Sequence, residues 1–201
     1  MCSSDLLLYQ GHGSYRIVTN EDFVIYIDPF AGEGDDLPAD LILVTHQHYD
    51  HNRIDLPAKK PSCEIITQAE ALKDKQYHTY TFNGIKVISV PAYNKNHAKE
   101  ECVGYVLFFD GLSLYASGDT STTDFMRLNL PSYHLDYALL PVDGKYNMDA
   151  KEASACAKTI GARHSIPIHT HEGMLFDRTV AEQFTAEGRI LLDGGQSLLL
   201  A

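Results

Sequence analysis

Residues 41 to 51 read Leu-Ile-Leu-Val-Thr-His-Gln-His-Tyr-Asp-His, an apolar run that ends in three histidines and one aspartate. The apolar part has the character of a buried β-strand, expected over 41–45. Alternate residues of an extended segment share a face, so His46 and His48 can approach one cation. Imidazole nitrogen together with carboxylate oxygen suits zinc or a similar divalent ion. A solvated surface cluster is the alternative, and the position directly after a strand argues against it.

Short β segments and a few helices make up the rest of the chain. The clearest helix is expected over 149–160, with Asp149 as N-cap, Glu152 three residues on and Gly161 as its end, and a second over 179–187. Asn83-Gly84 and Asp110-Gly111 predict tight hairpin turns. Strands are expected over 6–9, 15–18, 23–28, 41–45, 64–67, 79–82, 85–90, 104–109, 112–116, 137–140, 165–168, 190–193 and 197–200. This order indicates an α/β or α+β fold in which two mixed sheets pack together under outer helices.

Length and composition set the class of protein. A chain of 201 residues suits a single domain over 1–201. With 16 basic and 27 acidic residues the formal charge is -11, which makes nucleic acid an unlikely substrate. We expect no membrane span, no signal peptide and a cytoplasmic protein. The four cysteines, Cys2, Cys63, Cys102 and Cys156, are widely scattered and are expected to be reduced thiols.

The pattern His-x-His-x-Asp-His after an apolar strand resembles the signature of the metallo-β-lactamase superfamily, and the resemblance extends over nearly the whole chain. It implies a four-layer αβ/βα sandwich. An aspartate at the end of an earlier strand is supplied by Asp28, which would orient the loop and its ligands. Gly118-Asp119-Thr120, directly after a hairpin strand, matches the family's Gly-Asp-Thr.

The resemblance also implies a two-metal ligand set. His97 follows a further pair of strands, although by itself it could be an ordinary loop histidine. We prefer His169 to His171 as the last ligand because it follows the apolar run directly, whereas His171 would face substrate or solvent. One ion would be held by His46, His48 and His97, a second by Asp50, His51 and His169, with Asp119 shared between them.

Two further stretches are similar to a short stand-alone branch of the family that includes ascorbate-6-phosphate lactonase-like proteins. They are residues 10–15, which contain Gly11-His12, and residues 141–149, in which Asp143 takes the place of the branch's first glycine. His12, Lys145 and Tyr146 are therefore expected near the mouth of the site.

These features predict a metal-dependent hydrolase acting on a small molecule. Two divalent ions, Zn²⁺ by preference and otherwise Mn²⁺, Fe²⁺ or Ni²⁺, would bridge a hydroxide that attacks an ester, a lactone or a phosphodiester. Asp50 would orient this water or accept a proton from it. The ligands do not separate the ester from the phosphodiester, and the oligomeric state stays open.

Two other kinds of protein are compatible with the fold. One is a metal-binding sensor or scaffold without hydrolytic turnover. The other is a redox di-iron protein, which carries glutamate at the second ligand position and is therefore disfavoured by His48.

Overall fold

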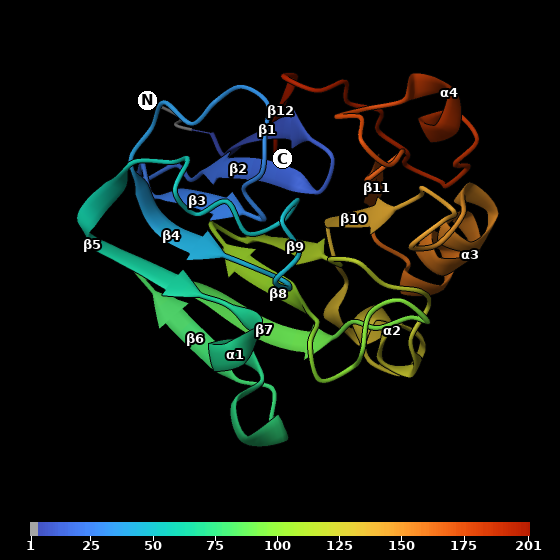
Figure 1. The fold of residues 1–201 in the computed structure, drawn as a ribbon, viewed down its shortest axis with the longest axis horizontal. Coiled ribbons are helices and arrows are strands. Elements are labelled where there is room, and N and C mark those ends of the chain that lie inside the picture. Colours follow the sequence, from blue (N-terminus) through green and yellow to red (C-terminus); the bar gives the residue numbers. More distant parts are fainter. Residues whose placement is uncertain (1–3) are drawn as a thin grey trace.

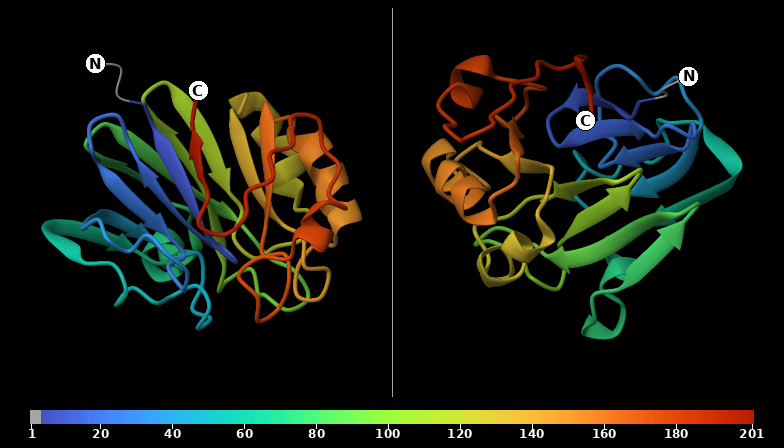
Figure 2. Two further views of the ribbon diagram at one scale, coloured as in Figure 1. Left: turned by 90° about the horizontal axis from the view of Figure 1, so that it is seen from above. Right: turned by 180° about the vertical axis from the view of Figure 1, so that it is seen from behind.

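Two six-stranded β-sheets pack face to face in the computed structural model, which describes residues 4–201 (Figures 1 and 2). The first sheet has the order β12 (Ser197–Leu199), β1 (Leu6–Gly11), β2 (Ser14–Val18), β3 (Val24–Ile27), β4 (Ala39–Leu43) and β5 (Lys59–Ile66). The second has the order β11 (His164–Ile168), β10 (Tyr137–Pro141), β9 (Leu112–Ala116), β8 (Val103–Phe109), β7 (Ile85–Pro91) and β6 (Thr79–Phe82). Each sheet contains parallel and antiparallel pairs, as expected for mixed sheets.

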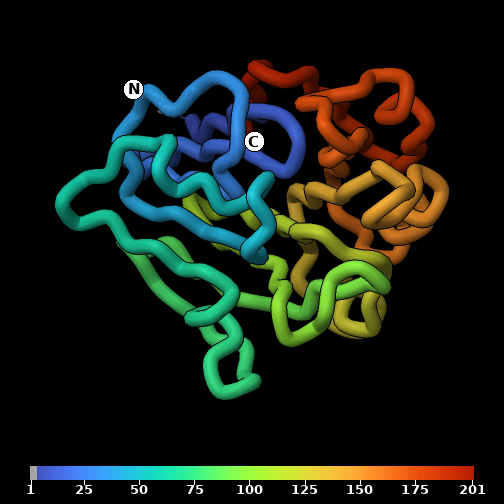
Figure 3. The backbone as a smooth tube through the Cα atoms, in the orientation of Figure 1, coloured from blue at the N-terminus to red at the C-terminus, as the bar shows by residue number. Residues whose placement is uncertain are grey.

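Helices are short and lie mostly toward the C-terminal half of the chain. They are α1 (Gln68–Ala71), α2 (Asp124–Leu128), α3 (Ala150–Ile160) and α4 (Arg178–Ala181), with 3₁₀ turns η1 (Lys73–Lys75) and η2 (Leu130–Tyr133). Figure 3 traces the backbone from the N-terminal sheet in blue and cyan to the C-terminal helices in orange and red. No helix within residues 4–201 is long and apolar enough to span a membrane.

The main core lies between the two sheets. Alternate strand residues point inward, so Leu7 and Ile25 of the first sheet belong to one buried cluster with Tyr105 and Leu107 of the second. A second cluster packs α2 and α3 onto the outer face of the second sheet, whereas loop residues such as Leu37 help to cover the outer face of the first. The expected α/β sandwich of two mixed sheets is confirmed.

Both predicted hairpins are present. Phe82 pairs with Ile85 across Asn83-Gly84, and the equivalent pairing of β8 with β9 spans Asp110-Gly111. All four turn residues have positive φ, between 45° and 82°. This is the type I′ geometry, whose twist matches that of the strands it joins.

The long helix is confirmed with its predicted N-cap, but the Glu152 side chain bonds to Thr122 and not to the backbone N–H of Asp149. Asp149 caps α3 by accepting a hydrogen bond from the backbone N–H of Glu152 at 2.7 Å, and Gly161 ends it with a φ of 70°. The Glu152 carboxylate accepts from the backbone N–H of Thr122 at 2.9 Å. It ties the loop after β9 to α3.

The second predicted helix, 179–187, is wrong in length, because α4 spans only Arg178–Ala181. Two interactions hold the following residues out of a helix. The guanidinium of Arg189 donates to the carbonyls of Glu182 and Phe184, and the backbone N–H of Thr185 donates to Ser154 Oγ. Backbone groups that a longer helix would use are therefore bonded elsewhere.

The strand predicted over 190–193 is also wrong. Only an isolated bridge between Arg189 and Ser165 joins this part of the chain to the edge strand β11. Asp193 and Gln196 then form a turn in which each backbone N–H is bonded to the other residue, so the chain leaves the sheet edge.

The cysteines agree with the prediction as far as the structure describes them. Cys63, Cys102 and Cys156 are free thiols, and Cys2 lies outside the described residues.

Candidate metal centre

Asp28 anchors the loop that carries the histidine cluster. It follows β3 directly, and its carboxylate accepts hydrogen bonds from the backbone N–H of Thr45 at 2.7 Å and from Thr45 Oγ1 at 2.6 Å. Its Oδ2 also lies 2.9 Å from His51 Nδ1. The strand predicted over 41–45 ends at Leu43, because the backbone N–H of Thr45 donates to the Asp28 carboxylate and its carbonyl accepts from Val103 of the second sheet. Asp28 thus fixes both ends of the loop.

Four buried histidines present the same ring nitrogen to the cluster. In each ring Nδ1 lies close to an oxygen atom of another residue, and Nε2 faces the interior of the cluster. The pairs are His46 with Thr45 Oγ1 (3.0 Å), His51 with Asp28 Oδ2 (2.9 Å), His97 with Asn94 Oδ1 (3.0 Å) and His169 with Asp143 Oδ2 (3.1 Å). A hydrogen on Nδ1 leaves the Nε2 lone pair available, which is the arrangement of metal-binding histidines.

Asp119 lies at the centre of these rings. Its Oδ2 is 3.4 Å from Nε2 of His97 and of His169, and 4.0 Å from Nε2 of His46. Its Oδ1 is 3.4 Å from Nε2 of His51. One carboxylate therefore faces nitrogen atoms that come from three separate loops.

The glycine before this aspartate is required by the local backbone. Gly118 has a φ of 63°, and a Cβ placed on it would lie 2.9 Å from both Thr45 Cβ and the carbonyl oxygen of Val103. A larger residue would push the loop of Asp119 away from the loop of the histidine cluster.

The potential ligands fall into two compact groups, and a third group, Asp28 with His46 and His51, overlaps both. In each group one ligand atom per residue lies within 4.8 Å of the others. The first contains His46, His48 and His97. The second contains Asp50, His51, His169 and, in addition, His12. The structure thus brings together the seven predicted ligands and Asp28.

The donor set fits divalent cations. The Nε2 atoms of His46, His51 and His169 are buried and have no hydrogen-bond partner among residues 4–201. Buried polar atoms in proteins nearly always have a partner, and a divalent cation supplies one for several lone pairs at once.

The histidines and aspartates of the site strongly affect one another's pKa values. Burial disfavours a charged His51, but the carboxylates of Asp119 and Asp28 outweigh it and raise its pKa to about 9. Burial disfavours an ionised Asp119 as well, but His169, His51 and the other rings hold its pKa well below the usual range. Burial and the neighbouring His51 lower the pKa of His46. Asp119 is therefore a carboxylate across the physiological range.

Two predicted residues lie outside the pocket. His171 is exposed, with Nδ1 2.6 Å from the carbonyl oxygen of Glu172. Lys145 is exposed and forms an ion pair with the Glu172 carboxylate. Neither side chain contributes to the lining, whereas Tyr146 does and donates its hydroxyl to Glu172 Oε1 at 2.7 Å.

The sequence interpretation missed several residues that support the cluster. In the sequence Asp143 stands out only as a departure from the branch's glycine, yet its carboxylate lies against His169 and accepts hydrogen bonds from the backbone N–H groups of Lys145 and Tyr146. An Asp-Gly pair in a loop predicts a turn, which was the available signal. No sequence pattern pointed to Asn94 or Glu172, because their roles depend on which loops meet.

The cavity beside the cluster measures about 410 Å³. Its lining comprises His12, Gln47, His48, Tyr49, Asp50, Asn96, His97, Asp119, Tyr146, His169 and Glu172. Such a volume suits a small molecule.

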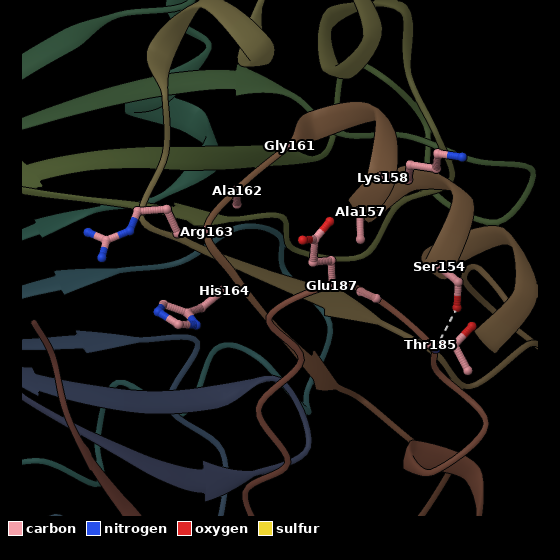
Figure 4. Close-up of a pocket in the computed structure, with 10 residues that line it drawn as sticks. Ser154, Ala157, Lys158, Gly161, Ala162, Arg163, His164, Thr185 and Glu187 are labelled. Atoms are coloured by element: carbon pink, nitrogen blue, oxygen red, sulfur yellow. Dashed lines mark hydrogen bonds between the residues drawn. The ribbon is translucent and has the colours of Figure 1, made fainter.

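A larger crevice of about 580 Å³ lies away from the cluster, between the end of α3 and residues 185–187 (Figure 4). The charged side chains of Lys158 and Arg163 point away from each other there, and Arg163 is paired with Asp136. The residues that line the crevice supply one histidine and one carboxylate, which is no metal-binding constellation.

Comparison with known proteins agrees with this architecture. A family model described as a beta-lactamase superfamily domain matches residues 6–169. The chain therefore belongs to the metallo-β-lactamase superfamily.

Within it, the chain is similar to proteins named UPF0173 metal-dependent hydrolases. That of Methanoregula boonei is 35% identical, with 96% of each chain covered, and that of Methanoculleus marisnigri is 33% identical, with 81% of this chain and 80% of the relative covered. The ascorbate-6-phosphate lactonase-like branch stays a prediction.

Solved structures show the same fold. A putative metal-dependent hydrolase from Parabacteroides distasonis superposes with a TM-score of 0.75 at 27% identity, covering 92% of this chain and 90% of the other. Igni18, a metallo hydrolase from Ignicoccus hospitalis, has a TM-score of 0.74 at 21% identity and covers 97% of both chains. At the latter identity the likeness concerns the fold alone.

Proposed function

We propose that this protein is a metal-dependent hydrolase with a two-ion site. His46, His48 and His97 would hold one ion, Asp50, His51 and His169 the other, and Asp119 would bind both. The observation that carries the proposal is that buried Nε2 atoms, which have no hydrogen-bond partner within the described part of the chain, converge on Asp119. Relatives named metal-dependent hydrolases support the same activity.

The chain's own residues would prepare this site for hydrolysis. Bound divalent ions lower the pKa of a water toward neutrality and stabilise negative charge that develops on a carbonyl or phosphoryl oxygen. Asp28 and Asp143 hold the rings of His51 and His169 in place. Asp50 is only partly buried and lines the cavity, so its carboxylate is placed to orient a water and accept its proton.

The lining favours an uncharged ester or lactone over a phosphate-bearing substrate. Asp50, Asp119 and Glu172 contribute carboxylates, while no lysine or arginine of the described chain lines the cavity. Lys145 lies outside the lining and is already paired with Glu172, which belongs to it. A phosphate outside the reach of the ions would therefore find no cationic partner.

Two other functions are alternatives that the experiment below distinguishes from hydrolysis. A sensor or scaffold would bind metal without turning over any ester or phosphodiester. A redox di-iron protein is disfavoured by His48, which is grouped with His46 and His97 where a redox relative carries glutamate. Zinc is the proposed metal, with manganese, iron and nickel as alternatives that depend on availability.

The decisive experiment combines metal analysis with a substrate screen. Protein purified without added metal is analysed for its elements, reconstituted with Zn²⁺ or Mn²⁺, and assayed on nitrophenyl esters, lactones and bis-nitrophenyl phosphate. We expect about two ions per chain and hydrolysis of esters or lactones.

Asp119→Ala should lose both ions and activity, while Asp124→Ala, which removes an exposed aspartate on α2, should lose neither. Full activity of Asp119→Ala in metal-free buffer would contradict the proposal. Two bound ions without turnover of any substrate would favour the sensor.

A further inference from the structure

We propose that His12 is an additional ligand of the second ion, next to Asp50, His51 and His169. This inference rests on the proposed two-ion site and deepens it. One ligand atom from each of the four residues lies within 4.8 Å of the others, so a single cation can reach all four. The sequence suggested only that His12 lies near the mouth of the site.

The backbone fixes His12 beside His169. It sits in the turn between β1 and β2 with a φ of 56°, and His169 has a φ of 46°. The carbonyl oxygen of His12 accepts hydrogen bonds from the backbone N–H of His169 and from the hydroxyl of Tyr9, both at 2.8 Å. Non-glycine residues in the left-handed region are uncommon and concentrate where a site dictates the backbone. Here both conformations place imidazole rings toward the same point.

The ring of His12 is oriented like the rings of the four buried ligands. Its Nδ1 lies 3.4 Å from the carbonyl oxygen of Met174, and its Nε2 lies 3.0 Å from Asp50 Oδ2. The side chain is 3% exposed, and its ring centroid is 3.7 Å from that of His169. With the hydrogen on Nδ1, the Nε2 lone pair faces the Asp50 carboxylate.

Two electron-rich atoms 3.0 Å apart need a positive charge between them. A proton on Nε2 would satisfy this need, in which case His12 only positions Asp50 by a hydrogen bond. A cation does so equally well and also serves the adjacent His51 and His169. A bound cation explains the arrangement of all four residues at once. A proton on His12 Nε2 would still leave the Nε2 atoms of His51 and His169 without a hydrogen-bond partner among residues 4–201.

Coordination number follows from this assignment. The first ion would have three histidines and Asp119, which suits tetrahedral zinc. The second would have His12, Asp50, His51, His169 and Asp119, which is more than a tetrahedral ion accepts. Five or six ligands suit manganese, iron, nickel or cobalt better. The two positions would therefore differ in metal preference.

The test compares His12→Gln with the wild-type full-length chain. Glutamine keeps a side-chain N–H that can donate to Asp50 but is a poor metal ligand. Cobalt(II) serves as the probe, because its visible absorption is stronger in four-coordinate than in higher-coordinate sites. Stoichiometry and affinity are measured by titration against a competing chelator.

We expect the wild type to take up two equivalents, the second with weak visible absorption. In His12→Gln the second equivalent should bind at least about tenfold more weakly, with stronger absorption per ion, as expected after loss of a ligand or its support. His12→Ala should behave in the same way. His78→Gln, a matched change at a half-buried histidine outside the cavity, should leave both equivalents unchanged.

An unchanged second equivalent in His12→Gln, in affinity and in spectrum, would overturn the inference and leave His12 as a residue that positions Asp50. Uptake of a single equivalent by the wild type would overturn it as well. Two equivalents without hydrolysis of any substrate would contradict the proposed hydrolase, while the comparison of the two proteins would still decide the role of His12.

Discussion

Asp143 Oδ2 lies 3.1 Å from His169 Nδ1. Asp143 occupies the position at which the ascorbate-6-phosphate lactonase-like branch has its first glycine. The side chain of Asp143 is 1% exposed, and its Oδ1 accepts hydrogen bonds from the backbone N–H groups of Lys145 and Tyr146 at 2.8 and 2.7 Å. One carboxylate therefore folds the loop after β10 and holds a ring of the candidate metal centre.

Asp143→Asn should separate these two tasks. The amide oxygen can still accept from the backbone, so the loop should keep its shape, but an uncharged amide N–H group would face His169 Nδ1 in place of the carboxylate oxygen. We expect the affinity for the second ion to fall about 10- to 100-fold, with the first ion little affected. Metal titration measures both. Asp143→Ala should also lower the melting temperature, and equal metal binding by all three proteins would show that Asp143 serves the loop alone.

Removing the ions should destabilise the fold, because ligands that bind the native state alone stabilise it by mass action. At a free metal concentration about 100 times the dissociation constant, the gain is about 2.7 kcal/mol, or roughly 5–10 °C in melting temperature for a chain of this size. Thermal unfolding with added Zn²⁺ or with chelator measures the shift. Asp119→Ala should show almost none of it, and a wild type that melts at one temperature in both buffers would count against tight binding.

Gly118→Ala should destabilise the protein more than an alanine at another glycine with positive φ. The left-handed backbone and the approach to Thr45 and Val103 together should cost about 2–4 kcal/mol. Gly84→Ala is the matched control, because its φ is 80° and nothing lies within 4 Å of the added Cβ. Chemical denaturation measures both changes. Equal losses would mean that the loop of Asp119 relaxes away from Thr45 without penalty.

Asp110→Asn should stabilise the fold at neutral pH more than at acid pH. The backbone N–H of Asn20 donates to both Asp5 and Asp110, which brings their carboxylates together, and burial together with Asp110 raises the pKa of Asp5 to about 6. A carboxyl whose pKa is higher in the folded state favours folding when protonated. Native stability therefore declines as the pH rises from about 4 through 6.

The substitution removes this repulsion, and asparagine also suits the left-handed turn position of residue 110. After allowance for solvent screening, we expect a gain of about 1 kcal/mol at pH 7.5, or roughly 2–4 °C, beyond the gain at pH 4. Thermal unfolding at both pH values measures it. Asp22→Asn, at another exposed turn aspartate with positive φ, is the control and should give the same change at both values.

Local sequence patterns were sufficient for the hairpins, for α3 with its caps, and for most of the strands. These features depend on neighbours in the chain: two residues with positive φ close a hairpin, and Asp149 with Gly161 bounds a helix. The helix predicted over 179–187 and the strand predicted over 190–193 were wrong for another reason. Backbone groups of these segments form hydrogen bonds with the side chains of Arg189, Ser154 and Gln196, which lie outside the local pattern.

The sequence from Leu41 to His51 by itself determined that an apolar strand is followed by a dense set of potential metal ligands, because strand periodicity and ligand chemistry are both local properties. Only the tertiary structure decided which distant groups complete that set. In the folded chain His12 contacts Asp50 and Asp143 contacts His169, whereas His171 and Lys145 lie outside the cavity lining. Those choices depend on how four loops pack at one end of two sheets, and no run of adjacent residues encodes such distances.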